Sequence, residues 1–179
     1  MGQIGLVPVG RVEPGLLEFL RFNLEEYFQK KVLLCQPLDE PTYAYDAKRK
    51  QCRSTAILDQ LIGYGKGVCE CALGVVSIDL FVPGLTFVFG EADLVNQVAV
   101  ISLARLDQRF YGLPEDNNLF FERALKEAIH ELGHTYGLRH CQDVECIMFF
   151  STSLADTDRK KPAFCPRCEK KYKLKLPLT

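Results

Sequence analysis

Apolar and polar positions at the start of the chain predict a strand, a helix and a second strand. Residues 3–9 are apolar and partly β-branched, as in a buried strand. Residues 14–30 carry apolar side chains at helical spacing behind Pro14, which suits the first turn of a helix. Residues 31–36 are apolar again and predict a strand. This alternation favours a right-handed crossover in a mostly parallel sheet.

The middle of the chain predicts one further helix and three further strands. Residues 37–52 are polar and interrupted by proline, so we expect a loop there. Ser54 can cap a helix that ends near Ile62, because a Gly-x-Gly-x-Gly run follows it from Gly63. The remaining apolar stretches predict strands at residues 72–78, 85–90 and 97–106, with a turn at residues 79–84.

A third helix, predicted to begin with Asn118 as its N-cap, contains the residues with the clearest chemistry. All three histidines of the chain lie within this helix or just beyond it. Histidines grouped at such intervals predict a metal site. Their order along the chain is His130-Glu131-x-x-His134-x-x-Gly137-x-x-His140.

The spacing explains how three histidines can share one metal ion. Positions four apart lie on one face of a helix, so His130 and His134 point the same way. Gly137 can end the helix in a left-handed conformation, after which His140 can reach back to the same ion. Three imidazoles and one water form the open arrangement of a catalytic zinc site, in which the pKa of the water falls to about 7. Glu131 lies roughly a quarter-turn away and can move the water's proton to a leaving amine.

Four cysteines behind the histidines predict a second metal site: Cys141, Cys146, Cys165 and Cys168. Each of their two close pairs can hold one side of an ion, and four thiolates make a closed tetrahedral zinc site that stabilises without catalysing. Such a site would tie down a C-terminal lobe of fewer than forty residues, which is too small for a core of its own. We expect the other cysteines to be buried or free thiols: Cys35, Cys52, Cys69 and Cys71.

Composition limits the location and the partners of the protein. The 179 residues suffice for one compact domain, and a net charge of −1 creates no global field for nucleic acid or an anionic membrane. No secretory signal opens the sequence, and no apolar run approaches the roughly 18 residues of a membrane span. We therefore expect a cytoplasmic protein without membrane contact, whose cysteines bind metal or stay reduced. We also expect a monomer.

The patterned residues resemble those of the archaemetzincins, one family of the metzincin zinc metallopeptidases. In that family a cysteine follows the third histidine directly, a second cysteine stands shortly before a methionine, and a Cys-x-x-Cys pair closes the pattern. Here these positions are Cys141, Cys146, Met148 and the pair that ends at Cys168. The resemblance covers residues 130–168, whereas the first 129 residues share only the general layout.

The resemblance implies a metzincin-like single α/β domain. It would contain a mixed twisted sheet, a backing helix, an active-site helix and a small zinc-stapled C-terminal lobe. The chain would divide into an N-terminal subdomain, residues 1–140, and a C-terminal subdomain, residues 141–179. The resemblance also implies that residues 85–92 form an antiparallel edge strand, whose free N–H and C=O groups pair with an extended substrate.

The resemblance further implies that Met148 lies beneath the zinc without binding it. Some metzincins support the transition state with a tyrosine just after this methionine. Phe149 and Phe150 stand here instead and lack the hydroxyl, so support for the oxyanion beyond the zinc is unassigned.

Motif and resemblance together predict a zinc-dependent metallopeptidase with two zinc ions per chain and a peptide or protein as substrate. The three histidines would hold the catalytic zinc, the four cysteines the structural zinc, and Glu131 would be the catalytic residue. Two alternatives stay open: a zinc-binding scaffold that recognises peptides with little or no catalysis, and a nucleic-acid module that uses the basic C-terminal zinc knuckle. For the basic residues between positions 159 and 175 we favour a solvated face, because few aromatic side chains lie among them.

Overall fold

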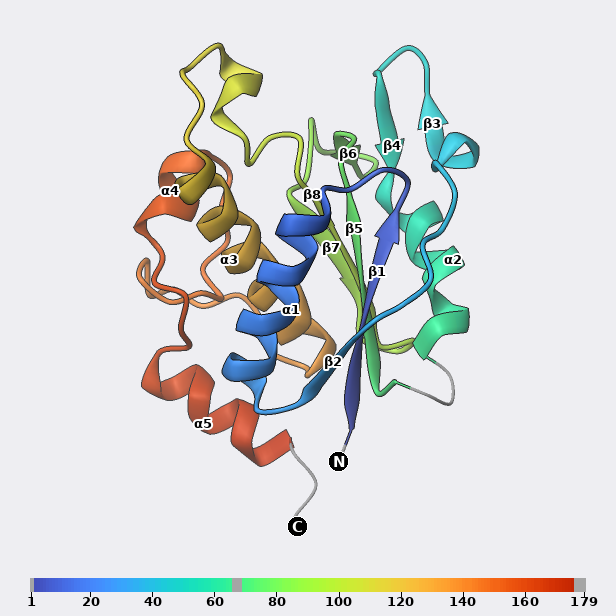
Figure 1. The fold of residues 1–179 in the computed structure, drawn as a ribbon. Coiled ribbons are helices and arrows are strands. Elements are labelled where there is room, and N and C mark those ends of the chain that lie inside the picture. The colour runs from blue at the N-terminus through green and yellow to red at the C-terminus, as the bar shows by residue number, and fades with distance from the viewer. Residues whose placement is uncertain (1, 66–68, 176–179) are drawn as a thin grey trace.

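A mixed five-stranded sheet forms the centre of the protein, as a computed structural model of residues 2–65 and 69–175 shows (Figure 1). The strand order is β2-β1-β5-β8-β7. The first four of these strands run parallel, and β7 runs antiparallel to β8 at one edge. The fold is therefore α/β with a mixed sheet, as predicted. The strands are β1 (Gln3–Val9), β2 (Lys31–Leu34), β5 (Cys71–Val76), β7 (Gly90–Asp93) and β8 (Val98–Ser102).

Helices cover both faces of this sheet. The helices α1 (Pro14–Phe28) and α3 (Asn117–Thr135) pack on one face, and α2 (Ser54–Gly65) packs on the other (Figure 1). Strands β1, β5 and β8 are therefore buried almost throughout, which explains why their sequences are continuously apolar. Helix α1 ends at Phe28 because Gln29 adopts a left-handed conformation with φ of 52°.

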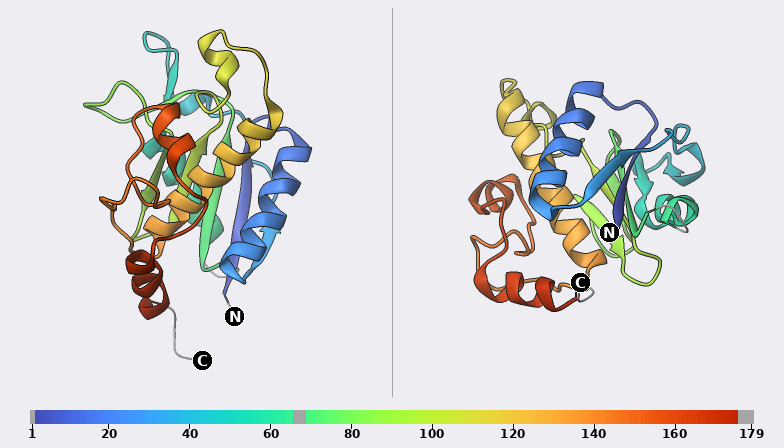
Figure 2. Two further views of the ribbon diagram at one scale, coloured as in Figure 1. Left: turned by 90° about the vertical axis from the view of Figure 1, so that its left-hand side faces the viewer. Right: turned by 60° about the horizontal axis from the view of Figure 1, so that its bottom comes forward.

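The C-terminal segment lies beside α3 rather than on the sheet (Figure 2). It contains two helices, α4 (Leu154–Arg159) and α5 (Pro166–Lys175). The guanidinium of Arg123 on α3 donates to both carboxylate oxygens of Asp158 at 2.6 and 2.7 Å, which fixes α4 on that helix. Ile147, Met148 and Tyr172 are buried in the same apolar core as α1 and α3. Among the described residues, no helix is both long and apolar enough to cross a membrane.

The predicted strand at residues 85–90 was wrong in its position. The antiparallel edge strand is β7, so it shares only Gly90 with the predicted strand and only residues 90–92 with the expected substrate-pairing strand. The reason lies in two side chains of another segment. Arg49 donates to the carbonyl oxygens of Leu85 and Thr86, and Gln51 also donates to that of Thr86. These carbonyl groups are therefore bonded to side chains instead of a neighbouring strand.

The predicted loop at residues 37–52 and the predicted turn at residues 79–84 were also incomplete. They contain a single-turn 3₁₀ helix, Thr42–Ala44, and three short strands. The strands are β3 (Tyr45–Asp46), β4 (Gln51–Arg53) and β6 (Leu80–Phe81), which form a second sheet in the order β3-β4-β6. Strands of two or three residues are too short for an apolar alternation to be visible in the sequence.

Several predicted element ends also differ from the structure: α1 ends at Phe28, β2 at Leu34 and β5 at Val76, each two residues before the predicted end. Strand β8 ends at Ser102 instead of residue 106, because the backbone turns where Leu106 and Asp107 donate to the carbonyl oxygen of Leu103. Helix α2 continues to Gly65 rather than ending near Ile62. Gly67, the last glycine of the predicted stop, lies outside the described residues.

Candidate metal centre and neighbouring pocket

Helix α3 carries two of the predicted metal ligands, His130 and His134, and begins two residues earlier than predicted. Its N-cap is Asp116, whose carboxylate accepts a hydrogen bond of 3.0 Å from the backbone N–H of Leu119. The prediction of Asn118 as N-cap was wrong, because Asp116 already satisfies the free N–H of the third helical position. The helix then runs along the sheet and places its last turns beside β7 and β8.

Two backbone carbonyl groups fix the rings of His130 and His134. The Nδ1 atom of His130 lies 2.7 Å from the carbonyl oxygen of Ile147, and that of His134 lies 2.8 Å from the carbonyl oxygen of Leu138. A carbonyl oxygen can only accept, so each Nδ1 carries the hydrogen. In a neutral imidazole the Nε2 atom is then bare and available to a metal. Burial lowers the pKa of both histidines, which favours this neutral form.

The structure brings all three histidines together. The ligand nitrogens of His130, His134 and His140 lie within 4.8 Å of one another. Gly137 has φ of 80° and produces the sharp turn that returns His140 to the helix. The Nε2 atoms of His130 and His134 are 3.1 Å apart. Two nitrogens bound to one tetrahedral zinc are about 3.3 Å apart, so this chain's residues fit the ion.

Glu131 is buried beside the histidine cluster and against the edge strand. Burial raises the pKa of its carboxyl group well above the ordinary value, and the nearby Glu127 raises it further. The backbone of Gly90 lies so close that an added Cβ atom would come within 2.6 Å of Glu131 Cγ and 2.7 Å of the Val100 carbonyl oxygen. Gly90 therefore leaves space for the glutamate side chain, a role that the sequence alone did not reveal.

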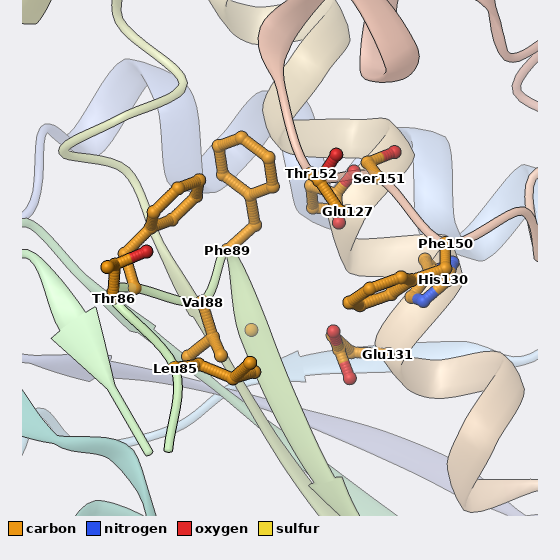
Figure 3. A pocket seen from close by; sticks show the side chains of 12 residues that line it. Leu85, Thr86, Val88, Phe89, Glu127, His130, Glu131, Phe150, Ser151 and Thr152 are labelled. Carbon is orange, nitrogen blue, oxygen red and sulfur yellow. The ribbon is translucent and has the colours of Figure 1, made fainter. Parts of the chain in front are cut away.

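A pocket opens beside Glu131 and His130 (Figure 3). Its volume is about 180 Å³, and residues 85–90 of the loop before β7 form much of its wall. Glu127 lies at one end of the pocket, together with Ser151 and Thr152 (Figure 3). Sequence analysis did not single out Glu127, and it was wrong to place its partner Lys160 on a solvated basic face, since that side chain is 0% exposed. A buried ion pair between residues 33 positions apart has no local sequence pattern.

The four predicted cysteines also lie together. Their sulfur atoms are within 4.8 Å of one another, and the Sγ atoms of Cys141 and Cys165 are 3.8 Å apart. Burial alone would raise the pKa of Cys165, but the Cys168 backbone N–H and neighbouring thiols lower it to about 7. A thiolate is thus favoured at Cys165, whereas burial raises the pKa of Cys146 and Cys168. The four remaining cysteines are free, and three of them are buried, as expected: Cys35, Cys52, Cys69 and Cys71.

Met148 connects the two clusters. Its side chain is fully buried, and its sulfur lies where Gly133 leaves room, 2.5 Å from the position of an added Cβ atom. The ring of Phe164 also lies close to that position, so Gly133 packs against two side chains.

Comparisons with known proteins place the chain in a family. The profile of peptidase family M54 matches residues 38–174. An archaemetzincin from Methanocaldococcus jannaschii is 44% identical over 169 residues, which are 94% of this chain and 92% of that relative. The crystal structure of an archaemetzincin from Methanopyrus kandleri has a TM-score of 0.84 at 39% identity and covers 97% of this chain and 94% of the other. A zinc-dependent peptidase from Methanocorpusculum labreanum has a TM-score of 0.85 at 29% identity, covering 94% and 99%.

The fold and these matches make the protein a zinc-dependent metallopeptidase, a hydrolase of peptide bonds. Within that class, the chain belongs to peptidase family M54, the family of the archaemetzincins.

Proposed function

We propose that His130, His134 and His140 hold the catalytic zinc and that Glu131 is the catalytic carboxylate. The convergence of the bare Nε2 atoms of His130 and His134 at 3.1 Å is the observation that carries this assignment. Two unprotonated nitrogens at that distance repel each other unless a cation lies between them. When bound, zinc lowers the pKa of a water to about 7 and polarises the carbonyl group of the substrate.

The side chain of Glu131 supplies the proton transfers. Its carboxylate takes a proton from the attacking water and delivers it to the nitrogen of the leaving amine. A raised pKa suits this role, because a carboxylate with a pKa nearer neutrality accepts a proton more readily. Burial against Gly90 holds the side chain in one place. The carbonyl oxygens of Ile147 and Leu138 keep two histidines in the tautomer that binds metal.

We propose that an extended peptide substrate pairs with the free edge of β7. Among the described residues, β7 pairs with β8 alone within the sheet, so its other edge offers N–H and C=O groups. The edge lies next to Glu131, because Gly90 is its first residue. A peptide paired with this edge would pass its backbone beside the histidine cluster.

We propose a second, structural zinc on the four cysteines, which gives two zinc ions per chain. Four sulfur ligands complete a tetrahedral shell and leave no position for water. The cluster ties α5 to the loop after α3, and this supports the proposed division into residues 1–140 and 141–179. None of the eight cysteines, all in the described part of the chain, forms a disulfide, which also supports a cytoplasmic location, where the environment is reducing. A monomer and the absence of nucleic-acid partners stay predictions.

The test is cleavage of a diverse peptide library by the zinc-loaded protein, read by mass spectrometry beside the Glu131→Ala variant. We expect new peptide termini only with the intact protein, and equal zinc content in both proteins. Hydrolysis that persists in Glu131→Ala would refute the role of this carboxylate. The positions of the cuts also distinguish cleavage inside a peptide from cleavage at its amino end.

A further inference from the structure

The pocket beside Glu131 combines an apolar wall with a polar end. Phe87, Phe89 and Phe150 contribute aromatic rings to its lining. Glu127 and Ser151 lie at the other end, as Figure 3 shows. Its volume of about 180 Å³ exceeds the roughly 150 Å³ of an apolar cavity that binds benzene. The pocket therefore has room for one six-membered ring of a substrate side chain.

The polar end is built from a buried ion pair. Lys160 Nζ donates to Glu127 Oε1 at 2.9 Å, and the Thr157 hydroxyl donates to the same oxygen at 3.3 Å. The side chain of Lys160 is 0% exposed and that of Glu127 is 3% exposed. No other ion pair in the described part of the chain has both side chains so deeply buried. Because desolvation roughly cancels the attraction in such a pair, stability alone does not explain it.

Two groups at this end have capacity for a further hydrogen bond. Both bonds to the Glu127 carboxylate go to Oε1, and Oε2 has no partner among the described residues. Ser151 is 8% exposed, and its hydroxyl is buried without a partner in the same part of the chain. A buried polar group without a partner destabilises the site, so a ligand that satisfies it binds more tightly.

Charge decides which ligand fits. Lys160 already balances the charge of Glu127, so a cationic side chain finds no unpaired partner there, whereas an anionic one would approach both Glu127 and Glu131. A neutral donor needs no charge partner and can bond to the free carboxylate oxygen. An aromatic ring suits the phenylalanine wall, since aromatic side chains pack favourably on one another. A ring with a neutral donor at its tip is a phenol.

We propose that this pocket binds a tyrosine side chain of the substrate and that Glu127 determines this specificity by accepting a hydrogen bond from the phenol hydroxyl. Ser151 adds a second hydrogen bond at the same tip. The inference rests on the proposed function, because it takes the neighbouring histidine cluster to be where the substrate is cut. It makes peptides with tyrosine next to the scissile bond better substrates than the same peptides with phenylalanine.

The test uses binding, so that it stays separate from hydrolysis. Two arylpropionyl hydroxamates that differ only in a para-hydroxyl group on the ring are titrated calorimetrically into the zinc-loaded protein. The hydroxamate binds the zinc, and the ring reaches the adjacent pocket. We expect the phenol compound to bind about 10- to 100-fold more tightly, as for one buried hydrogen bond to a charged acceptor.

Three variants sharpen the result. In Glu127→Leu/Lys160→Met the pair is replaced by apolar side chains of similar size, which a folded protein tolerates. We expect the preference to fall to within about threefold there and to fall part of the way in Ser151→Ala. Glu122→Gln is the matched control, because Glu122 lies on the same helix with a side chain that is 50% exposed. We expect the full preference in that variant.

Equal binding of the two hydroxamates by the unmodified protein would overturn the proposal, even if every variant failed to fold. A preference that survives in Glu127→Leu/Lys160→Met would also overturn it. Binding with the expected preference but without any peptide cleavage would support the pocket and refute the proposed hydrolysis. Cleavage without a preference for tyrosine would refute the proposed tyrosine specificity of the pocket and leave the proposed hydrolysis intact.

Discussion

The histidine cluster and the cysteine cluster begin at adjacent residues, His140 and Cys141, yet they differ in what surrounds them. The histidine cluster faces a pocket and has the carboxylate of Glu131 beside it. The cysteine cluster has four like ligands, and two of them, Cys146 and Cys168, are buried. Three ligands leave a coordination position for water, whereas four close the shell. The difference teaches that consecutive residues of one loop, His140 and Cys141, can each contribute a ligand to a cluster of a different kind.

Short backbone contacts couple the two clusters. The carbonyl oxygen of Ile147 orients His130, and Ile147 follows Cys146 directly. The backbone N–H of Cys141 donates to the carbonyl oxygen of Met148 at 2.9 Å. A zinc ion on the cysteines would therefore hold the segment that orients His130. We expect damage at the cysteines to reach the histidines, and damage at the histidines to stay local.

The largest expected effect follows from Cys165→Ser. This variant should lose one zinc ion, much of its thermal stability and its hydrolytic activity. The binding free energy of a structural zinc is folding free energy, on the order of 10 kcal/mol in small zinc domains, and the C-terminal segment depends on it. Metal analysis and a melting curve measure the outcome. Cys52→Ser is the control, because Cys52 is a buried free thiol far from the cluster in sequence.

A Cys165→Ser protein that keeps two zinc ions would contradict the four-cysteine site. One that loses a zinc but keeps its activity would contradict the coupling between the clusters.

His134→Ala should lose activity without losing the stability of the fold. We expect the loss of one zinc ion and a fall in kcat/KM of at least about 10²-fold, which is roughly 2.7 kcal/mol in transition-state stabilisation. The melting temperature of the zinc-free variant should stay close to that of the zinc-free unmodified protein, because α3 is held by the sheet and by α1 without metal. If this variant fails to fold, the histidine site also stabilises the fold, and the proposed difference between the two sites is contradicted.

Sequence analysis correctly predicted the elements and clusters whose key residues recur at short, regular intervals along the chain. Apolar spacing located β1, α1, β5 and β8, because their burial follows the repeat of a strand or a helix. Intervals of four and six residues placed the three histidines together, since a helix and one left-handed glycine determine the geometry. The cysteines followed from their close pairs in the same way.

The parts that were not predicted depend on contacts between distant segments. The position of β7 depends on Arg49, which binds carbonyl groups 36 and 37 residues away. The space for Glu131 depends on Gly90, and the buried carboxylate of Glu127 depends on Lys160. None of these pairs has a periodic signal, and each is determined only once the sheet has brought its two segments together.

Gly133→Ala tests the packing between the clusters and should have an intermediate effect. The new Cβ atom would stand 2.5 Å from Met148 Sδ and 3.3 Å from Phe164 Cε1. Met148 is fully buried and has little room to move, so overpacking should destabilise the protein by about 1–3 kcal/mol. The gain in helix propensity, about 1 kcal/mol, offsets part of this loss. Chemical denaturation measures the difference, and a more stable variant would show that the methionine can retreat.

Gly63→Ala is the matched control for that change, since nothing lies within 4 Å of the position that its Cβ atom would take on α2. We expect this substitution to be stabilising, because it brings only the gain in helix propensity.

The smallest expected effect concerns pH and separates the open site from the closed one. Burial lowers the pKa of His130 well below its ordinary value, so the folded zinc-free protein binds fewer protons there than the unfolded chain. Stability contributed by this group is present above a pH of about 6.5 and is lost as the pH falls below it. The raised pKa of Glu131 acts in the opposite direction, because a buried carboxyl group is more stable when protonated. The experiment therefore uses zinc-free Glu131→Gln.

Between about pH 7.5 and about pH 5.5, this variant should lose on the order of 1 kcal/mol of unfolding free energy. Exposed carboxyl groups stay ionised in that range, so they do not obscure the change. Restoring zinc should abolish the loss until protons displace the metal, because a bound histidine must be neutral. Cys165 adds a loss in the same direction, because its pKa is lowered to about 7 and acidification protonates a thiolate that the unfolded chain lacks. Zinc-free Glu131→Gln/His130→Asn is therefore measured beside the first variant, and we expect a smaller loss in it, since only the contribution of His130 is removed. A stability that is constant or rises on acidification would mean that His130 is not held in its neutral form by burial.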